Sequence, residues 1–177
     1  MLDRKLYKII EQALGRDYIE QYPEKFEYRI IVQKAMYLLT NANRVKNIKL
    51  PYKWNFYLYG PYSSEMAHMI YHINEVSEEV EKKQIDIRSK ERRCIEHFSN
   101  LKSEVRKIHK KKDVGEKLSL SEIYEIMGTI TYFVGQVGNN REKVRDIFGN
   151  YKPKLQSKVP NSIFNQLYSI LEQYKYI

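Results

Sequence analysis

The spacing of apolar and polar residues along the chain predicts mostly helices. Apolar residues recur at helical spacing in four runs, which are residues 2–14, 24–43, 119–137 and 161–174. Gly15 follows the first run as a stop, and the capping box Ser119-Leu120-Ser121-Glu122 opens the third. The second run is apolar around most of the circumference of a helix, so we expect it to be the central buried helix.

Shorter elements are expected between and after these runs. Residues 53–59 alternate between apolar and polar, with Trp54, Phe56 and Leu58 on one face, which predicts a strand. Residues 84–88 show the other short alternation, and because one strand cannot stand alone we pair the two as a small sheet. A helix over residues 63–79 should lie between them, and one over residues 141–148 should precede the last run.

Residues 89–112 predict a long, largely exposed helix with one narrow apolar stripe. The stripe steps by four, three, four and three residues through Cys94, Phe98, Leu101, Val105 and Ile108. It could pack on its own domain or on a second copy of the chain, so a homo-oligomer is one of the possible partners. We interpret residues 110–112 and 113–117 as the fraying end of this helix and a linker.

The expected fold is therefore mainly α, a single-domain helical protein with a small two-stranded β element. We divide residues 1–177 into a helical core over 1–80, a basic strand and long helix over 81–112, and C-terminal helices over 118–177. Gly128 and Gly135 lie inside the helix predicted over 119–137, where glycine lowers stability, so we expect a close neighbour at both positions.

Composition narrows the cellular setting. Cys94 is the one cysteine, which excludes an internal disulfide and favours a reduced, cytoplasmic location. The N-terminal residues mix charges with apolar residues, unlike a signal peptide, and no apolar run reaches the ~20 residues that span a bilayer. We expect no membrane partner.

The positive charge is concentrated in one segment. Residues 81–112 hold 12 basic and 5 acidic residues, a balance of +7 within a net charge of +9. These side chains could form a solvated helix face, meet an acidic protein surface, or contact the phosphate backbone of a nucleic acid in a winged-helix-like arrangement. The candidate nucleic-acid-binding residues are Arg88, Lys90, Arg92, Arg93, Lys102, Arg106, Lys107, Lys110, Lys111 and Lys112.

Sequence motifs of common enzymes and metal sites are absent. The chain contains no HExxH, GxSxG, GxGxxG or Walker pattern. His68 and His72 share a helix face, and Cys94 and His97 form CxxH, but each pair supplies only half of a zinc site. We therefore expect a non-catalytic protein with no cofactor and no metal, and keep a hydrolase or metal protein that uses His68 and His72 as a third possibility.

One stretch carries a family resemblance. A helix segment with the pattern QKxxYLL is followed, after a gap, by an aromatic strand that ends in YGPYS. The matching positions are Gln33, Lys34, Tyr37, Leu38, Leu39, Phe56, Tyr59, Gly60, Pro61, Tyr62 and Ser63. In this order the chain resembles the small bacterial YwgA-like proteins and, more distantly, the SocA-like (Panacea) antitoxin domain, over residues 29–73. Residues 41–47 depart from that pattern, which often has a glycine there.

The resemblance implies a small, mainly helical domain that works by protein contact. For the SocA-like group it implies neutralisation of a toxin or delivery of a toxin to a protease, and it supplies no catalytic residues. We thus expect an antitoxin or adaptor whose partner is a toxin or a protease-linked target. Its partner-binding residues are expected to be Lys34, Tyr37, Tyr59, Gly60, Pro61, Tyr62 and Ser63.

The residues of this junction support two readings of their own. Gly60 and Pro61 shape a turn and Ser63 can cap the following helix, whose first N–H groups, with Lys34 nearby, could hold an anion or a carboxylate of a partner. Alternatively, the turn only reverses the chain while Tyr37 and Tyr59 pack together.

Overall fold

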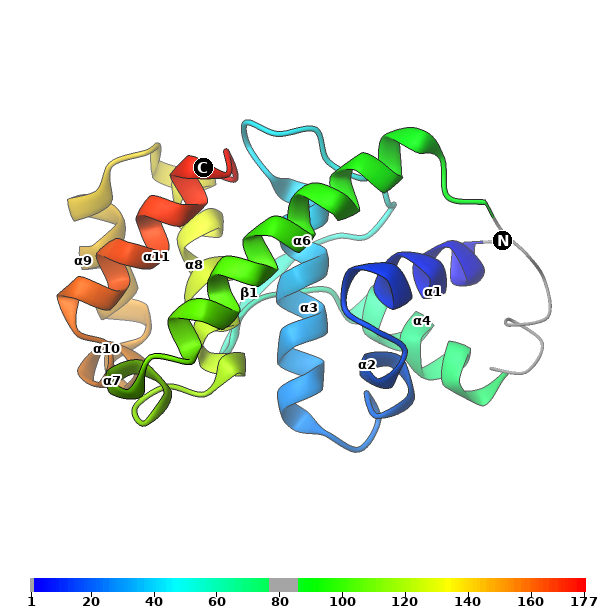
Figure 1. Cartoon of the computed structure of the whole chain (residues 1–177), viewed down its shortest axis with the longest axis horizontal. Helices are drawn as coiled ribbons and strands as arrows, with labels where there is room; N and C mark the ends of the chain where they lie inside the picture. The colour runs from blue at the N-terminus through cyan, green and yellow to red at the C-terminus, as the bar shows by residue number, and fades with distance from the viewer. Residues whose placement is uncertain (1, 77–85) are drawn as a thin grey trace.

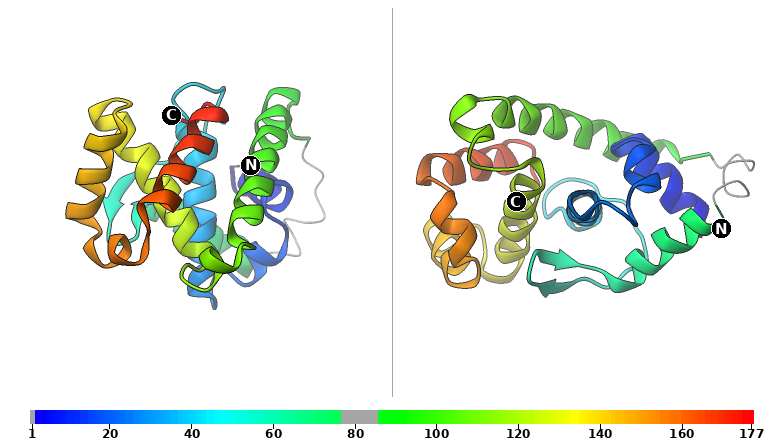
Figure 2. Two further views of the ribbon diagram at one scale, coloured as in Figure 1. Left: turned by 60° about the vertical axis from the view of Figure 1, so that its left-hand side comes forward. Right: turned by 90° about the horizontal axis from the view of Figure 1, so that it is seen from below.

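A buried helix lies at the centre of the fold. The computed structural model describes residues 2–76 and 86–177. Helix α3 (Phe26–Asn41) is buried without interruption from Ile30 to Leu39, as its apolar circumference predicts. Seen along its axis in the right-hand view of Figure 2, α3 is surrounded by other helices and by a small hairpin. Every element described below is therefore positioned against α3 or against its direct neighbours.

Two groups of helices flank α3 (Figure 1). On one side lie α1 (Leu2–Ala13), α2 (Asp17–Glu20) and α4 (Ser64–Glu75). On the other lie α8 (Leu120–Val137), α9 (Arg141–Tyr151), α10 (Pro153–Lys158) and α11 (Asn161–Gln173). The mainly α fold class is thus confirmed, and no helix in the described ranges is long and apolar enough to cross a membrane.

The long helix α6 (Ser89–His109) runs across both groups. Its apolar stripe is buried within the chain, with Phe98, Leu101 and Val105 fully covered. The Lys102 ammonium donates a hydrogen bond of 2.5 Å to the carbonyl oxygen of Ala13, at the end of α1. The stripe therefore packs on its own chain and is not available to a second copy.

The small sheet is a hairpin, and its second strand is not the expected one. Strand β1 (Asn55–Tyr57) pairs antiparallel with β2 (Gly60–Tyr62), with Phe56 opposite Pro61. The pairing of residues 53–59 with 84–88 is wrong for the described part, because residues 86–88 form no strand; residues 84 and 85 lie outside the described residues. The chain reverses at Leu58 and Tyr59, so the GPY segment, which follows the turn directly, becomes the strand that pairs with β1.

Gly60 makes this reversal possible in two ways. Its φ of +86° lies in the left-handed region, which glycine adopts without strain. A Cβ at this position would also stand 2.7 Å from the Thr129 hydroxyl oxygen of α8. The hairpin thus lies so close to α8 that no side chain fits between them.

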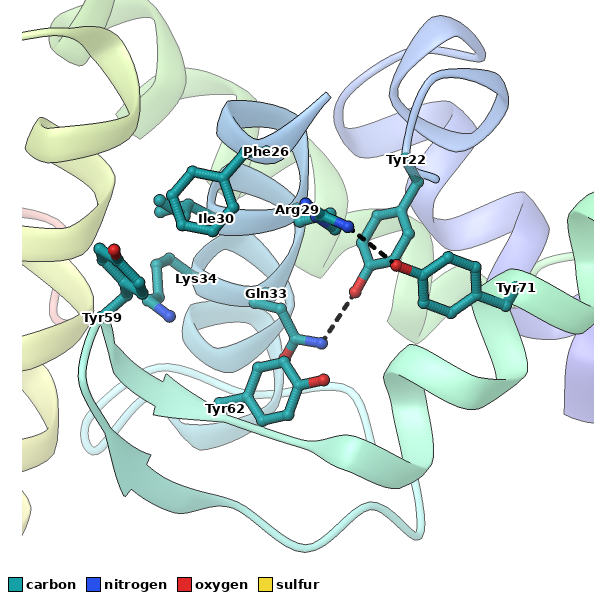
Figure 3. Close-up of a pocket in the computed structure, with 9 residues that line it drawn as sticks. All are labelled: Tyr22, Phe26, Arg29, Ile30, Gln33, Lys34, Tyr59, Tyr62 and Tyr71. Atoms are coloured by element: carbon teal, nitrogen blue, oxygen red, sulfur yellow. Dashed lines mark hydrogen bonds between the residues drawn. The ribbon is translucent and has the colours of Figure 1, made fainter. Parts of the chain in front are cut away.

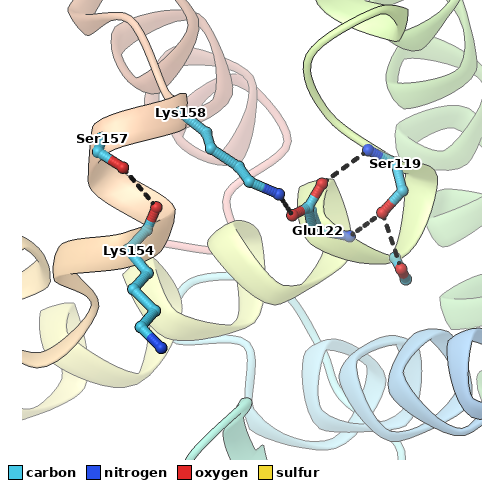
Figure 4. A network of polar contacts seen from close by, with 6 residues as sticks. Ser119, Glu122, Lys154, Ser157 and Lys158 are labelled. Atoms are coloured by element: carbon cyan, nitrogen blue, oxygen red, sulfur yellow. Dashed lines mark hydrogen bonds and ion pairs between the residues drawn. The ribbon is translucent and has the colours of Figure 1, made fainter.

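The helix boundaries depend on local capping. The Ser63 hydroxyl accepts a 3.3 Å hydrogen bond from the Met66 N–H, which confirms Ser63 as the cap of α4. The predicted end of this helix, residues 77–79, lies outside the described residues. At α8 the capping box is confirmed by reciprocal bonds of Ser119 and Glu122, and Lys158 of α10 pairs with Glu122 at 2.7 Å (Figure 4).

Two regions near the C-terminal half differ from expectation. A one-turn helix, α7 (Lys112–Gly115), stands where we expected a linker. Helix α9 continues three residues beyond 148, and α10 lies in a stretch where we predicted no element. Pro153 occupies the first turn of α10, where its missing N–H costs no helical hydrogen bond.

The two interior glycines of α8 have different surroundings. A Cβ at Gly128 would contact the Lys34 side chain at 3.2 Å, so the expected close neighbour is present. A Cβ at Gly135 would have no neighbouring atom within 4 Å among the described residues, so the expectation of a close neighbour there is wrong.

These surroundings predict opposite effects for one substitution. Gly60→Ala should lower the free energy of unfolding by ~2 kcal/mol or more, because alanine is strained at positive φ and its methyl group meets Thr129. Gly135→Ala should raise it by ~0.5–1 kcal/mol, because it adds helix propensity in open space. Urea denaturation of both variants checks the pair, and a neutral Gly60→Ala would contradict the account of the turn.

Candidate functional site

The hairpin is fixed from beneath by two successive residues of α3. The Lys34 ammonium donates a 2.8 Å hydrogen bond to the carbonyl oxygen of Pro61. The Gln33 amide accepts from the Ser63 N–H at 3.0 Å and donates to the Ser63 carbonyl oxygen at 3.2 Å. The QK pair and the GPYS segment, 30 residues apart, are therefore the two halves of one contact.

A second lysine holds the hairpin tip. Lys152, at the break between α9 and α10, donates from its ammonium to the carbonyl oxygen of Leu58. The same ammonium pairs with the Glu125 carboxylate of α8 at 2.7 Å, and both side chains are buried. We call Gln33, Lys34, Glu125 and Lys152 the clamp, since they join the hairpin to three helical segments.

The clamp holds more positive than negative charge. Lys34 is 1% exposed and forms no ion pair with a described residue, because the Glu125 carboxylate bonds to Lys152. Burial lowers the pKa of Lys34 to about 7; Glu125 opposes this shift, and Lys152 adds to it. Burial also lowers the pKa of Lys152, against the opposing effect of Glu125. The interior beneath the hairpin thus contains two lysines and one carboxylate.

Exposed aromatic and aliphatic side chains gather around the clamped hairpin. Leu58, at its tip, is 77% exposed, and Tyr59 is 41% exposed and packs edge-on against Phe26. We call the full set the hairpin surface; it consists of Phe26, Tyr57, Leu58, Tyr59, Tyr71 and Tyr151. These six are all the large hydrophobic side chains that the described part of the chain exposes. Tyr151 packs against Phe56 of β1, and Tyr71 lines the same pocket as Tyr62, so the whole set borders the hairpin.

Two pockets open beside the hairpin, and Lys34 lines both. One, of about 250 Å³, lies along residues 57–60 and Tyr62. The other, which we call the tyrosine pocket, has a volume of about 230 Å³ and lies between α3, α4 and the hairpin (Figure 3). Its lining is Tyr22, Phe26, Arg29, Ile30, Gln33, Lys34, Tyr59, Tyr62 and Tyr71.

The structure brings most of the expected partner-binding residues together, but largely inside the protein. Lys34, Gly60, Pro61 and Ser63 are buried at the contact between α3 and the hairpin. Tyr59 is exposed, and Tyr62 is half-buried in the tyrosine pocket. The buried members shape and fix the hairpin, while the exposed ones are available for contact.

Tyr37 lies away from the hairpin surface. It is buried and packs edge-on against Trp54, at 5.2 Å between ring centroids, and against Tyr132. Among the described residues, no ring contact joins it to Tyr59, whose ring meets Phe26 instead. The alternative reading in which Tyr37 and Tyr59 pack together is therefore wrong.

The basic residues of α6 and its surroundings are mostly free in solvent. Lys102 is the exception, because it bonds to Ala13, and Lys107 forms an exposed pair with Glu104 at 2.7 Å. The remaining eight are exposed: Arg88, Lys90, Arg92, Arg93, Arg106, Lys110, Lys111 and Lys112. They are accessible to a partner, and none of the pockets found in the described part of the chain is lined by them.

The histidines and the cysteine fall at separate places. His68 and His72 are exposed on α4, and the buried Cys94 thiol donates to the Lys46 carbonyl oxygen at 3.1 Å. The ring of His97 bonds to the Tyr174 carbonyl oxygen at 2.7 Å. Within the described ranges, no three side chains of the metal-binding types lie close enough to hold an ion.

Several residues of the site carry no recognisable signal in the sequence. Glu125 lies among apolar residues in α8. Its carboxylate on the core side of the predicted helix was the one feature that could have indicated a role in the interior. Lys152 precedes a proline in a stretch, residues 149–159, for which we predicted no element. Arg29 and Tyr71 come from different helices and meet only in the folded chain.

Comparisons with known proteins add no relative. No protein-family model matches the chain, and neither a curated protein nor a solved structure is measurably similar to it.

The buried lysine predicts how stability depends on pH. The pKa of Lys34 is about 7 in the folded chain, against ~10.4 for a free lysine, so between these values the unfolded chain binds more protons. The free energy of unfolding should therefore rise from pH ~7 to ~9.5, by at most ~1.4 kcal/mol per pH unit. Raised tyrosine pKa values, such as that of buried Tyr22, act in the opposite sense only above about pH 10.

Urea denaturation at a pH of about 7, 8 and 9.5 measures this dependence. Lys34→Met should reduce the slope, because a side chain of similar length without a titratable group replaces the amine. The exposed Lys110→Met is the matched control and should keep the wild-type slope. Equal slopes in all three proteins would mean that Lys34 stays protonated in the folded chain.

Proposed function

We propose that this chain is a non-catalytic protein-interaction module that binds its partner through the hairpin surface. The observation that carries the proposal is the gathering of all six exposed large hydrophobic side chains of the described chain around one hairpin. Tyrosine, the commonest residue of this set, offers a large contact area with few rotatable bonds and is enriched in binding hot spots.

The clamp supports the same proposal. A hairpin of two three-residue strands has little stability by itself, so a free hairpin would lose conformational entropy on binding. Here Lys34, Gln33 and Lys152 already hold its backbone carbonyl groups. Binding through a preorganised loop costs less entropy, which favours a contact role for the tip.

The resemblance of residues 29–73 to YwgA-like and SocA-like proteins favours an antitoxin or adaptor among the possible modules. The partner would then be a toxin or a protease-linked target, met in the cytoplasm.

Removing apolar surface at the tip tests this proposal. Leu58→Asp combined with Tyr57→Ser should reduce the affinity for the partner at least ~10-fold, because two exposed contact residues are lost without any change to the clamp. The measurement is capture of nuclease-resistant proteins from cells of the native host, followed by titration of the protein that the wild type recovers at a fixed ratio. Asn100→Asp, on the exposed side of α6, is the control and should bind as the wild type does.

If the double variant captures the same protein with unchanged affinity, the hairpin surface is not the contact. If the wild type has twice the mass of one chain in solution and the variant does not, the partner is a second copy.

A second candidate function rests on the basic segment. Eight exposed cationic side chains with no ion pair among the described residues could contact a phosphate backbone. In that case the logarithm of the affinity for duplex DNA should fall linearly with the logarithm of salt concentration. Arg106→Gln with Lys110→Gln should lower the steepness of this dependence by ~2, since each lost phosphate contact removes about one counterion. A slope unchanged by the substitutions would exclude this segment as the contact.

A further inference from the structure

The tyrosine pocket has an unusual electrostatic composition. Two cationic residues line it, Arg29 and Lys34, and none of its lining residues is acidic. Arg29 forms no ion pair with any described residue; its guanidinium donates to the Tyr71 hydroxyl at 3.1 Å and lies over the Phe26 ring. Lys34 has one hydrogen-bond acceptor among the described residues, the Pro61 carbonyl oxygen. Both cations therefore have donor capacity left for an anion.

Two hydroxyl groups of the pocket, those of Tyr22 and Tyr71, can still donate a hydrogen bond. The Tyr22 hydroxyl oxygen accepts from the Gln33 amide at 3.1 Å, and the Tyr71 hydroxyl oxygen accepts from Arg29. Each of these bonds uses an oxygen as acceptor, so the proton of each hydroxyl remains available. Figure 3 shows both hydroxyls, and that of Tyr62, directed toward the same part of the pocket as the Arg29 guanidinium.

Tyr22 and Tyr62 keep their phenolic protons at physiological pH. Burial raises the pKa of Tyr22, and a smaller opposing effect comes from its bond to Gln33. Burial also raises the pKa of Tyr62, with Tyr71 and Tyr57 adding to the shift. The polar part of the pocket thus offers N–H and O–H donors, which suits a ligand group that only accepts, as an ionised carboxylate does.

The walls and the size of the pocket define the rest of the ligand. Tyr22 and Tyr71 meet edge to face at 5.5 Å, and Phe26 meets Tyr59 in the same way at 4.9 Å. Aromatic walls with these geometries accept a flat ring. The volume of about 230 Å³ is below the ~300–1,000 Å³ of pockets for drug-sized ligands, so the occupant is the size of one side chain.

We infer that the tyrosine pocket binds an aromatic carboxylate, with the carboxylate at Arg29 and the hydroxyls of Tyr22 and Tyr71, and the ring between the aromatic walls. This chemistry occurs in a small aromatic acid and in a protein chain that ends in Phe or Tyr. The second source rests on the proposed protein-binding function, and the first does not.

Titration of the full chain with three probes tests the inference. The probes are 3-phenylpropionate, N-acetyl-L-phenylalanine and the neutral amide of N-acetyl-L-phenylalanine, followed by NMR or calorimetry. Both acids should bind at least ~10-fold more tightly than the amide. Tighter binding of N-acetyl-L-phenylalanine than of 3-phenylpropionate identifies a chain end as the source, and the reverse order identifies a free acid.

Two variants locate the binding. Arg29→Gln should weaken both acids at least ~10-fold and leave the amide unchanged, and Tyr71→Phe should weaken both acids about fivefold, because it keeps the ring and removes one donor. Arg44→Gln, at an exposed arginine outside the pocket, is the control and should bind as the wild type does. The far-ultraviolet circular dichroism of each variant checks that it is folded.

The inference is overturned if neither acid binds, if the amide binds as tightly as the acids, or if Arg29→Gln binds the acids with wild-type affinity. These results are independent of the proposed function, because no partner protein is present. If a partner is captured through Leu58 and Tyr57 but the pocket binds neither acid, the proposed function is supported and only the inference about the pocket is wrong.

Discussion

The arrangement of the site depends on one buried polar contact, in which two lysines hold backbone carbonyl groups of a short hairpin and the Glu125 carboxylate pairs with one of them, Lys152. Backbone carbonyl groups buried without donors cost free energy, and this hairpin turns its Leu58 and Pro61 carbonyl oxygens toward the interior. Lys34 and Lys152 satisfy them from two different parts of the chain. The cost is a buried cation beyond what Glu125 neutralises, which is expensive in a low-dielectric interior. Replacing the two lysines with apolar residues would remove the buried cation but leave both carbonyl oxygens without these donors, so the network exchanges one cost for the other.

Other local features of the chain follow from the same contact. The Lys34 side chain crosses α8 at Gly128, where a larger residue would compete with its methylene groups. Lys152 reaches the hairpin from the short break between α9 and α10, so the proline that restarts the helix also sets the position of the ammonium group. Gly60 brings the backbone against Thr129 and lets the GPY segment return along β1. Residues distant in sequence thus restrict one another's size and position, because Gly60, Gly128 and the two lysines all pack around the same hairpin.

The sequence predicted what depends on local periodicity and missed what depends on long-range contact. The central helix, the capped start of α8 and the cap at Ser63 are local patterns, and all three are present. The strand partner was wrong, because alternation shows that a segment can be extended but not which segment it meets. The QK and YGPYS segments were both recognised, yet their direct hydrogen bonds could not be derived, since nothing local specifies how α3 is rotated. Lys152 and Glu125 were missed for the same reason.

The positions of the buried and the exposed residues separate the part of the motif that supports the hairpin from the part that faces solvent. The residues that carry the family resemblance are mainly interior ones, such as Gln33, Lys34 and Pro61, and a change in any of them disturbs the clamp. The side chains of Tyr57 and Leu58 at the tip are exposed, and Leu58 bonds to Lys152 through its backbone carbonyl oxygen, so both side chains can vary with little effect on the fold. A surface of this kind can change its partner by substitution at the tip while the support beneath stays the same. The family resemblance therefore describes the support of the hairpin, whereas Tyr57 and Leu58 at its tip lie outside the matched positions.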